Sequence, residues 1–422
     1  MFTVSIIGCG SRGRDAYGKL FYKQKDRWKI VSLCDVSEHQ LKATGDEFKV
    51  DDKNRFNDEK EFFKEKRSDL LVIATQDNDH VRQAIKAMEL GYDLLLEKPI
   101  SGKREELFKL LDIYEKTGRK VMICHVLRYA PAYVKIAEAI KSGKLGKIVS
   151  IEAVEQVGYW HFAHSFVRGN WRNSEQTSPI ILQKCCHDMD ILQYFASSAC
   201  KRIYSVGSLS FFNKNNKPEG AADRCAECRY LNDCAYSAEN QYIARWKKEK
   251  SLPDCWPFNV VCKDTPNTEE KLRKAYETNP YGRCVFACDN NVCDNQQVLI
   301  EFENGIHASL QMIGFSSDMG RKIAIYGTEG YVNYDGAGFN TTLKISLYGK
   351  DEKVYNGEEL VAALGEDAFG HGGGDVMMMN ALYDMLCGDA ETETSLKKSV
   401  ESHLMAIAAE ESRLSGKVIT IR

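Results

Sequence analysis

A glycine-rich turn directly follows the first apolar run of the chain. Gly8, Gly10 and Gly13 come after residues 2–7, and Asp35 closes the next apolar run. Glycine at these positions permits a tight turn, a close approach of the backbone to a pyrophosphate, and close packing of the next helix on the sheet. The pattern therefore predicts a dinucleotide site that binds phosphate through backbone N–H groups at a helix N-terminus.

The position of Asp35 bears on the type of dinucleotide. It follows Gly13 by roughly 20 residues, the distance at which a carboxylate accepts hydrogen bonds from a ribose 2′-hydroxyl. The same carboxylate would repel a 2′-phosphate, so we expect NAD in preference to NADP. A glycine pattern alone would fit an ordinary strand-to-helix turn equally well, so this interpretation depends on the combination.

Hydrophobic runs divide the chain into two parts. Apolar runs separated by helix-length segments predict a parallel, doubly wound sheet, and they occupy residues 2–7, 28–35, 70–75, 92–97 and 120–125. Longer alternating strands follow at 147–157, 203–212, 298–303 and 306–313, the last two joined by the hairpin signal Asn304-Gly305. Helices at 375–386 and 395–414 and a strand at 418–421 end this part. We expect a Rossmann domain over 1–125 and an α+β domain with a large, mostly antiparallel open sheet over 126–422.

Composition limits the possible partners. The formal net charge is −3 over 422 residues, and no basic face is expected that would bind nucleic acid. No apolar run approaches the roughly 20 residues that cross a bilayer. The first strand begins by residue 3, which leaves no room for a secretory signal. These features predict a cytoplasmic protein with no membrane partner.

A second motif stands at the end of the apolar strand 92–97. Glu97-Lys98-Pro99 brings an acid and a base to the carboxyl edge of the predicted sheet, where ligands bind in open α/β folds. Lys98 is a candidate catalytic residue, because an ammonium there stabilises developing alkoxide charge on a substrate oxygen. A surface ion pair is the alternative for this motif.

With these motifs the sequence resembles the Gfo/Idh/MocA oxidoreductases over most of its length, including the segments 128–131 and 187–190. The resemblance implies NAD(P)-dependent chemistry on secondary hydroxyls of sugars or cyclitols, and a homo-oligomer, dimer or tetramer, formed through the open sheet. It implies that Lys98 contacts both nicotinamide and substrate, with a cis peptide before Pro99. The expected cofactor-binding residues are Gly8, Gly10, Ser11, Arg12, Gly13, Asp35, Thr75, Asn78, His80, Glu97, Lys98 and Arg128.

The resemblance also makes His187 the candidate general base, because an imidazole near neutral pKa takes a hydroxyl proton as hydride leaves carbon. Asp190 lies three residues on and shares the helix face of His187, so we expect it to orient the ring or bind substrate. The family commonly has an aspartate where this chain has Gln183, which positions a hydroxyl but carries no proton. Lys184 is the candidate that compensates.

A polar and aromatic cluster precedes the His187 helix. Aromatic faces stack on sugar C–H groups, and amide or guanidinium groups bind hydroxyls, so these side chains suit a polyhydroxylated ligand. A surface loop is the alternative for any single residue, and the arginines leave an acidic or phosphorylated sugar open. The candidates are Tyr159, His161, Arg168, Asn170, Trp171, Arg172 and Gln183.

Cysteines gather in a predicted insertion at 213–294. Cys225, Cys228 and Cys234 suit a structural zinc ion or, less well, an iron–sulfur cluster, and free thiols are the alternative. Relatives with this insertion suggest Cys284 as the fourth ligand. A weaker feature is the glycine-rich segment that begins at His371. It is expected to start a helix capped by Asp375, and it makes His371 a candidate for a position over the active site.

Three functions fit the sequence. The first is a net sugar or cyclitol dehydrogenase or reductase. The second is a redox-neutral glycosidase or lyase, in which NAD oxidises a ring hydroxyl transiently and thereby acidifies the neighbouring C–H. The third is a non-catalytic NAD sensor, which would not need Lys98 and His187 together.

Overall fold

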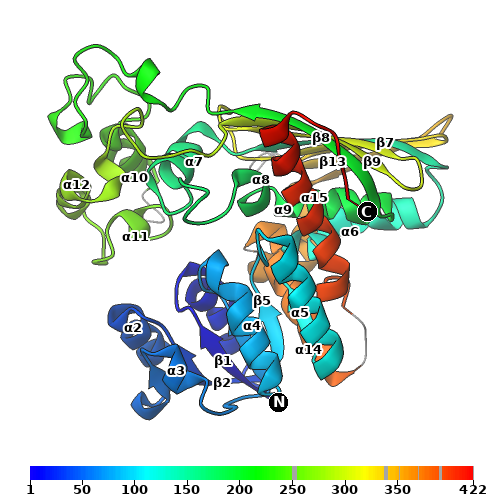
Figure 1. The fold of residues 1–422 in the computed structure, drawn as a ribbon, viewed down its shortest axis with the longest axis horizontal. Coiled ribbons are helices and arrows are strands. Elements are labelled where there is room, and N and C mark those ends of the chain that lie inside the picture. Colours follow the sequence, from blue (N-terminus) through cyan, green and yellow to red (C-terminus); the bar gives the residue numbers. More distant parts are fainter. Residues whose placement is uncertain (250–253, 337–340, 351, 369, 389–391, 422) are drawn as a thin grey trace.

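A computed structural model describes residues 1–249, 254–336, 341–350, 352–368, 370–388 and 392–421 (Figure 1). Residues 250–253 of the predicted insertion lie outside this range. The described residues form two sheets. The first is six-stranded, in the order β3-β2-β1-β4-β5-β6, with every neighbouring pair parallel. Its strands are β1 (Phe2–Ile7), β2 (Trp28–Cys34), β3 (Arg55–Phe56), β4 (Leu70–Ile73), β5 (Asp93–Leu96) and β6 (Val121–Ile123). The predicted Rossmann sheet is confirmed, with the two-residue β3 as an addition.

Helices connect these strands. The glycine turn leads into a wide helical turn, η1 (Ser11–Gly18), and then into α1 (Lys19–Lys23). The others are α2 (Glu38–Phe48), α3 (Glu59–Phe62), α4 (His80–Glu89) and α5 (Arg104–Thr117). Strand β4 is fully buried, which agrees with its uninterrupted apolar sequence and with cover on both faces.

The second sheet has nine strands in the order β14-β13-β12-β11-β7-β10-β9-β8-β15, and only the pair β7 and β10 is parallel. The predicted antiparallel sheet is therefore confirmed. Gly305, with φ of +82°, makes the expected hairpin between β9 and β10. The strands are β7 (Ile148–Gln156), β8 (Cys200–Ser208), β9 (Asn295–Phe302), β10 (His307–Ile313), β11 (Gly320–Gly327), β12 (Gly330–Asp335), β13 (Thr342–Leu347), β14 (Lys353–Asn356) and β15 (Ile419–Thr420).

Strand β8 ends earlier than expected. The sequence predicted a strand through residue 212, but the carboxylate of Asp294 accepts hydrogen bonds from the N–H groups of Ser210 and Phe211. These bonds replace ladder bonds, so the segment after Ser208 is a loop.

Helices α6 (Pro131–Lys141), α8 (Ile180–Gln183) and α9 (Cys186–Ala196) lie on one face of the large sheet (Figure 1). Beyond α7 (Tyr159–Phe162), the insertion forms a lobe with α10 (Arg245–Lys248), α11 (Phe258–Val261) and α12 (Glu269–Thr278). None of the described helices combines the length and apolarity that crossing a bilayer requires.

Two helices near the end of the chain complete the Rossmann core. Met378 and Leu382 of α14 (Gly374–Cys387) pack in one apolar cluster with Val4 of β1. Val400 of α15 (Leu396–Ser415) packs in the cluster on the other side of the sheet, with Leu71 of β4. The proposed domain boundary at residue 125 stays a prediction, but segments from beyond it cover both faces of the first sheet.

Candidate active site

A cavity of about 230 Å³, the central cavity, lies where the carboxyl ends of β4 and β5 meet α9 and the segment before α14. Many of its lining residues are charged or aromatic. They are Arg12, Ala74, Thr75, Gln76, Asp77, Glu97, Lys98, Cys124, Val126, His161, Phe166, Trp171, Gln183, Lys184, His187 and His371. The cavity therefore brings together the glycine-turn arginine, the Glu97-Lys98 pair and the candidate base.

The glycine turn has the geometry that a dinucleotide requires. Gly8 has φ of +90°, and a Cβ atom there would lie 2.4 Å from the carbonyl oxygen of Ala74. A Cβ atom on Gly13 would lie 1.9 Å from the carbonyl oxygen of Gly8. By contrast, no atom lies within 4 Å of the corresponding position at Gly10, and Ser11 is exposed. The space beside Gly10 is thus open to a phosphate, and the residues present fit the cofactor.

Asp35 is fixed beside this turn. Its Oδ2 accepts a hydrogen bond from the N–H of Cys9 at 2.6 Å, and its Oδ1 accepts one from Ser37 at 2.7 Å. A carboxylate oxygen accepts more than one hydrogen bond, so both oxygens keep capacity for a ribose hydroxyl.

Glu97 is a buried carboxylate held ionised by two cations. Arg12 Nε lies 2.7 Å from Oε1 of Glu97, and the hydroxyl of Tyr17 donates to the same oxygen at 2.6 Å. Burial acts to raise the pKa of Glu97, but Arg12 and Lys98 outweigh it and hold that pKa below its usual value. The negative charge of Glu97 fixes Arg12 at the cavity.

Lys98 and His187 line the same cavity. The ammonium of Lys98 donates to the carbonyl oxygen of Gln183 at 3.3 Å, and the Lys98–Pro99 peptide is cis. His187, on α9, is 6 % exposed, and its Nδ1 has no hydrogen-bond partner in the described part of the chain. Burial, together with the charges of Lys98 and Arg321, lowers the pKa of His187 well below its ordinary value. The imidazole is therefore neutral near pH 7.

A charged network lies behind Lys184. Its Nζ lies 3.3 Å from Oε1 of Glu155, whose other oxygen lies 2.9 Å from Nη2 of Arg321. Arg321 also donates to Asp188 at 2.8 Å. Burial, opposed by Arg321 and assisted by Glu155, raises the pKa of Asp188 to about 6. Lys184 is thus positioned by a buried carboxylate rather than free to move.

Asp190 and Arg128 bind each other instead of the predicted ligands. Nε and Nη2 of Arg128 donate to the two oxygens of Asp190, each at 2.7 Å, and both side chains are buried outside the central cavity. The carboxylate of Asp190 is therefore engaged by Arg128, and its expected role beside His187 stays a prediction. The expected role of Arg128 in the cofactor site likewise stays a prediction.

Two further expected cofactor residues, His80 and Asn78, contact backbone carbonyl groups. The ring nitrogens of His80 face the carbonyl oxygens of Pro99, at 2.7 Å, and Thr75, at 3.2 Å. This contact links the two loops that border the cavity. Asn78 donates to the carbonyl oxygen of Gln176 at 2.9 Å.

Only part of the expected substrate cluster reaches the cavity. His161, Trp171 and Gln183 line it. The other four make contacts elsewhere, and their role in substrate binding stays a prediction. Tyr159 packs edge-on against Tyr236, Arg172 pairs with Asp289, Asn170 is exposed, and Arg168 lies in a different pocket.

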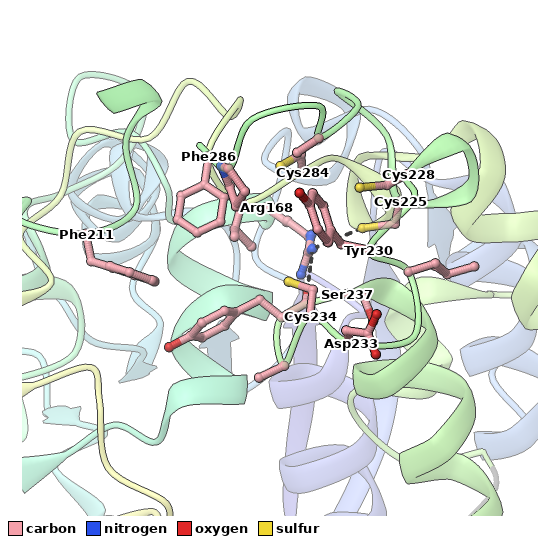
Figure 2. A pocket seen from close by; sticks show the side chains of 16 residues that line it. Arg168, Phe211, Cys225, Cys228, Tyr230, Asp233, Cys234, Ser237, Cys284 and Phe286 are labelled. Carbon is pink, nitrogen blue, oxygen red and sulfur yellow. Dashed lines mark hydrogen bonds between the residues drawn. The ribbon is translucent and has the colours of Figure 1, made fainter. Parts of the chain in front are cut away.

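That pocket, the cysteine pocket, has a volume of about 360 Å³. Cys225, Cys228, Cys234 and Cys284 line it, and Figure 2 shows Arg168 reaching among their sulfurs, 3.6 Å from Cys225 Sγ. However, among the described residues no three His, Cys, Asp or Glu side chains are placed to hold a metal ion. The arrangement therefore does not supply the predicted zinc or iron–sulfur site.

The glycine-rich segment at His371 suggested a position over the active site, and His371 lines the cavity. The sequence did not point to Glu155 and Arg321. Glu155 and Arg321 are register partners on β7 and β11. Opposite charges at paired positions of two strands would have predicted this contact, but only if the sequence had first identified β11 as a strand.

Comparison with known proteins agrees with this geometry. The model of the oxidoreductase family described as an NAD-binding Rossmann fold matches residues 2–125, and the C-terminal alpha/beta domain of that family matches residues 137–421. YteT of Bacillus subtilis is 22% identical over 411 residues, which are 92% of each chain. An inositol 2-dehydrogenase of Salmonella typhimurium is 21% identical over 199 residues, 47% of this chain and 55% of that protein.

The fold is also that of known structures. The WlbA dehydrogenase from Bordetella pertussis, solved with NADH and UDP-GlcNAcA, aligns with a TM-score of 0.68 at 15% identity, over 99% of this chain and 97% of that one. Both family domains, the six-stranded parallel sheet and the open glycine turn are present. The chain therefore belongs to the Gfo/Idh/MocA family of NAD(P)-dependent oxidoreductases.

Proposed function

We propose that this protein transfers hydride between NAD and a secondary hydroxyl of a sugar or cyclitol. The observation that carries the proposal is the pairing of a cation and a neutral imidazole, Lys98 and His187, in one cavity beside the glycine turn. The relatives support the substrate class, since one is an inositol 2-dehydrogenase and another was solved with a nucleotide sugar acid.

The residues that line the cavity have separate roles in this reaction. Bound NAD supplies the hydride acceptor. Neutral His187 accepts the hydroxyl proton, and the ammonium of Lys98 stabilises the negative charge that develops on that oxygen. Trp171 offers a face for sugar C–H groups, and Gln183 hydrogen-bonds a hydroxyl. Lys184, held by Glu155, adds a donor at the same wall.

A redox-neutral reaction is the second candidate. It uses the same oxidation, followed by loss of a proton from the neighbouring carbon, and so it needs one more acid or base. The observation in its favour is that His187 is not the lone imidazole of the central cavity, whose lining also holds His161 and His371.

We also propose that the protein is a homo-oligomer, a dimer or tetramer, formed through the large sheet. Tyr204 and Leu299 are register partners on β8 and β9, and they are 36 % and 59 % exposed. Apolar side chains exposed together on a sheet favour burial against another surface. Light scattering on the wild type and on Leu299→Lys tests this, and a monomeric wild type would contradict it.

The test of the proposed reaction is a panel of sugars, cyclitols, uronic acids and glycosides, each incubated with purified protein and NAD. Reduced-nicotinamide absorbance and aglycone release are followed together. Accumulating NADH from a free sugar or polyol supports net oxidation, whereas aglycone release without net NADH supports the redox-neutral reaction. Neither signal with any compound would contradict both.

A further inference from the structure

His371 lies on the wall of the central cavity that the C-terminal part of the chain provides. It precedes α14 and lines the cavity together with Lys98 and His187. The ring centroids of His187 and His371 are 6.0 Å apart. His371 and His187, from distant parts of the sequence, therefore line one ligand space, together with a third imidazole, His161.

The backbone at His371 is held in an unusual conformation. Its φ is +46°, in the left-handed region that residues other than glycine rarely adopt, between Gly370 at +75° and Gly372 at +62°. Such strain persists only where the surroundings fix the residue, and it gathers at functional sites. Here the fixing contact is made by the side chain of His371 itself.

That contact is a histidine–carboxylate pair. Nδ1 of His371 lies 3.0 Å from Oδ2 of Asp375, and Asp375 in turn pairs with Arg12 at 2.7 Å. A carboxylate at Nδ1 favours the tautomer with the proton on Nδ1, which leaves the lone pair of Nε2 free to act as a base. The side chain of His371 is 37% exposed, so a ligand can reach it.

His187 has no comparable support. Its Nδ1 has no hydrogen-bond partner within the described ranges, and burial keeps the ring neutral. Oxidation of one hydroxyl requires one base, and His187 suffices for it. His371, an imidazole paired with a carboxylate, is therefore not needed for net dehydrogenation. It is suited to a proton transfer at another atom of the substrate.

We propose that His371, oriented by Asp375, exchanges a proton with the substrate carbon next to the oxidised one. This inference rests on the proposed function, in which NAD⁺ is the oxidant that first makes the ketone. The adjacent C–H bond then breaks, a new N–H bond forms at Nε2 of His371, and the electron pair passes into the enolate. Asp375 balances the imidazolium charge.

The first test needs no substrate. Protein labelled with ¹⁵N-histidine is examined by NMR near pH 7, and His371→Gln identifies the signals of this residue. We expect a protonated Nδ1 and an unprotonated Nε2. A proton on Nε2 alone, or a fully charged ring at that pH, would overturn the proposal. His307→Gln, a change at an exposed histidine on β10, is the matched control and should leave these signals in place.

The second test follows exchange. Wild type, His371→Gln and His307→Gln are incubated in D₂O with NAD⁺ and myo-inositol, methyl β-D-glucoside or methyl α-D-galactoside, and proton NMR records the replacement of C–H by C–D. We expect exchange in wild type and the control, and exchange slower by a factor of about 100 in His371→Gln. Reduced nicotinamide formed in a single turnover should persist in that variant, because His187 serves that step.

The outcomes separate the two proposals. Undiminished exchange in His371→Gln, or reduced nicotinamide without exchange in wild type, would overturn the role of His371 while leaving the dehydrogenase intact. Neither reduced nicotinamide nor exchange with any probe would overturn the proposed function and the exchange step with it. The tautomer of His371 would still be measured independently.

Discussion

Arg12 of the glycine turn and Asp375 at the start of α14 form an ion pair, with 2.7 Å between Nη2 and Oδ1. The same guanidinium binds Glu97, and the same carboxylate binds His371. One arginine thus connects the cofactor turn to two walls of the central cavity, and the charge at each wall depends on it.

Arg12→Ala should destabilise the protein by about 2 kcal/mol, because it leaves the buried carboxylate of Glu97 without its closest cation. Arg12 is partly exposed, which reduces the loss below that of a fully buried pair. Urea unfolding at pH 7 measures it. Adding Glu97→Gln to Arg12→Ala should recover most of the loss, and no recovery would contradict this account.

Lys98→Ala and His187→Ala should each abolish turnover while NAD binding survives, since both residues line the cavity and neither forms the glycine turn. Gln183→Ala should be milder, because glutamine carries no proton. Steady-state rates and NADH fluorescence titrations make the comparison. Full activity of His187→Ala would remove this residue from the role of base.

The carboxylate of Asp35 should set the choice of cofactor. We expect NADH to bind at least about tenfold more tightly than NADPH, because a 2′-phosphate would meet a fixed negative charge. Fluorescence titration gives both affinities. In Asp35→Ser the difference should shrink, and equal affinities in the wild type would refute the assignment.

The rate should fall as the pH drops below about 6. The pKa of Asp188 is raised to about 6, so its carboxyl group becomes neutral below that pH and releases Arg321. Arg321 can then draw Glu155 away from Lys184. The pKa of His187 is lowered well below its ordinary value by burial and by Lys98, so we do not expect this residue to cause the fall.

Profiles of kcat/KM from pH 5 to 8 test this assignment. Asp188→Asn should be less active than wild type and should lack the fall near pH 6, because its amide does not titrate. A fall centred near 6.5 that persists in Asp188→Asn would point to His187 instead.

Elemental analysis decides the zinc prediction. The four cysteines line one pocket, but their sulfurs are not placed as a ligand set, and Arg168 brings a positive charge among them. We therefore expect zinc and iron well below one atom per chain in protein purified without a metal-binding tag. One zinc per chain, lost in Cys225→Ser, would show that the cysteines rearrange around a metal.

Local sequence patterns placed five strands of each sheet, β1, β2, β4, β5 and β6 in the first and β7, β8, β9, β10 and β15 in the second. Buried strands such as β4 are continuous apolar runs, and Gly305 marks its hairpin. The pattern did not place β3, β11, β12, β13 or β14. Strand β3 has two residues and the side chains of β14 are mostly exposed, so both lack the periodic signal that burial provides. In β11 and β12 buried positions alternate with less buried ones, so for these two strands the periodic signal is present in the sequence.

The same distinction between local and distant signals applies to the residues of the site. Lys98 and His187 each belong to a local motif, and both lie at the cavity, because the end of β5 and the start of α9 fix where their side chains point. Helical spacing placed Asp190 near His187, but it gave no sign that Arg128 would engage the carboxylate. His371 reaches the cavity through folding of a segment far along the chain, which spacing within the sequence does not encode.

The packing of α14 and α15 on the first sheet has a consequence for synthesis. The strands of the first sheet are complete once Ile123 has been made, but Met378 and Val400, which cover its two faces, come more than 250 residues later. At about 5–20 residues per second on the ribosome, that interval is on the order of half a minute. During this time the nascent N-terminal part exposes apolar sheet surface, so its final closure and the joining of Arg12 to Asp375 must follow translation of nearly the whole chain.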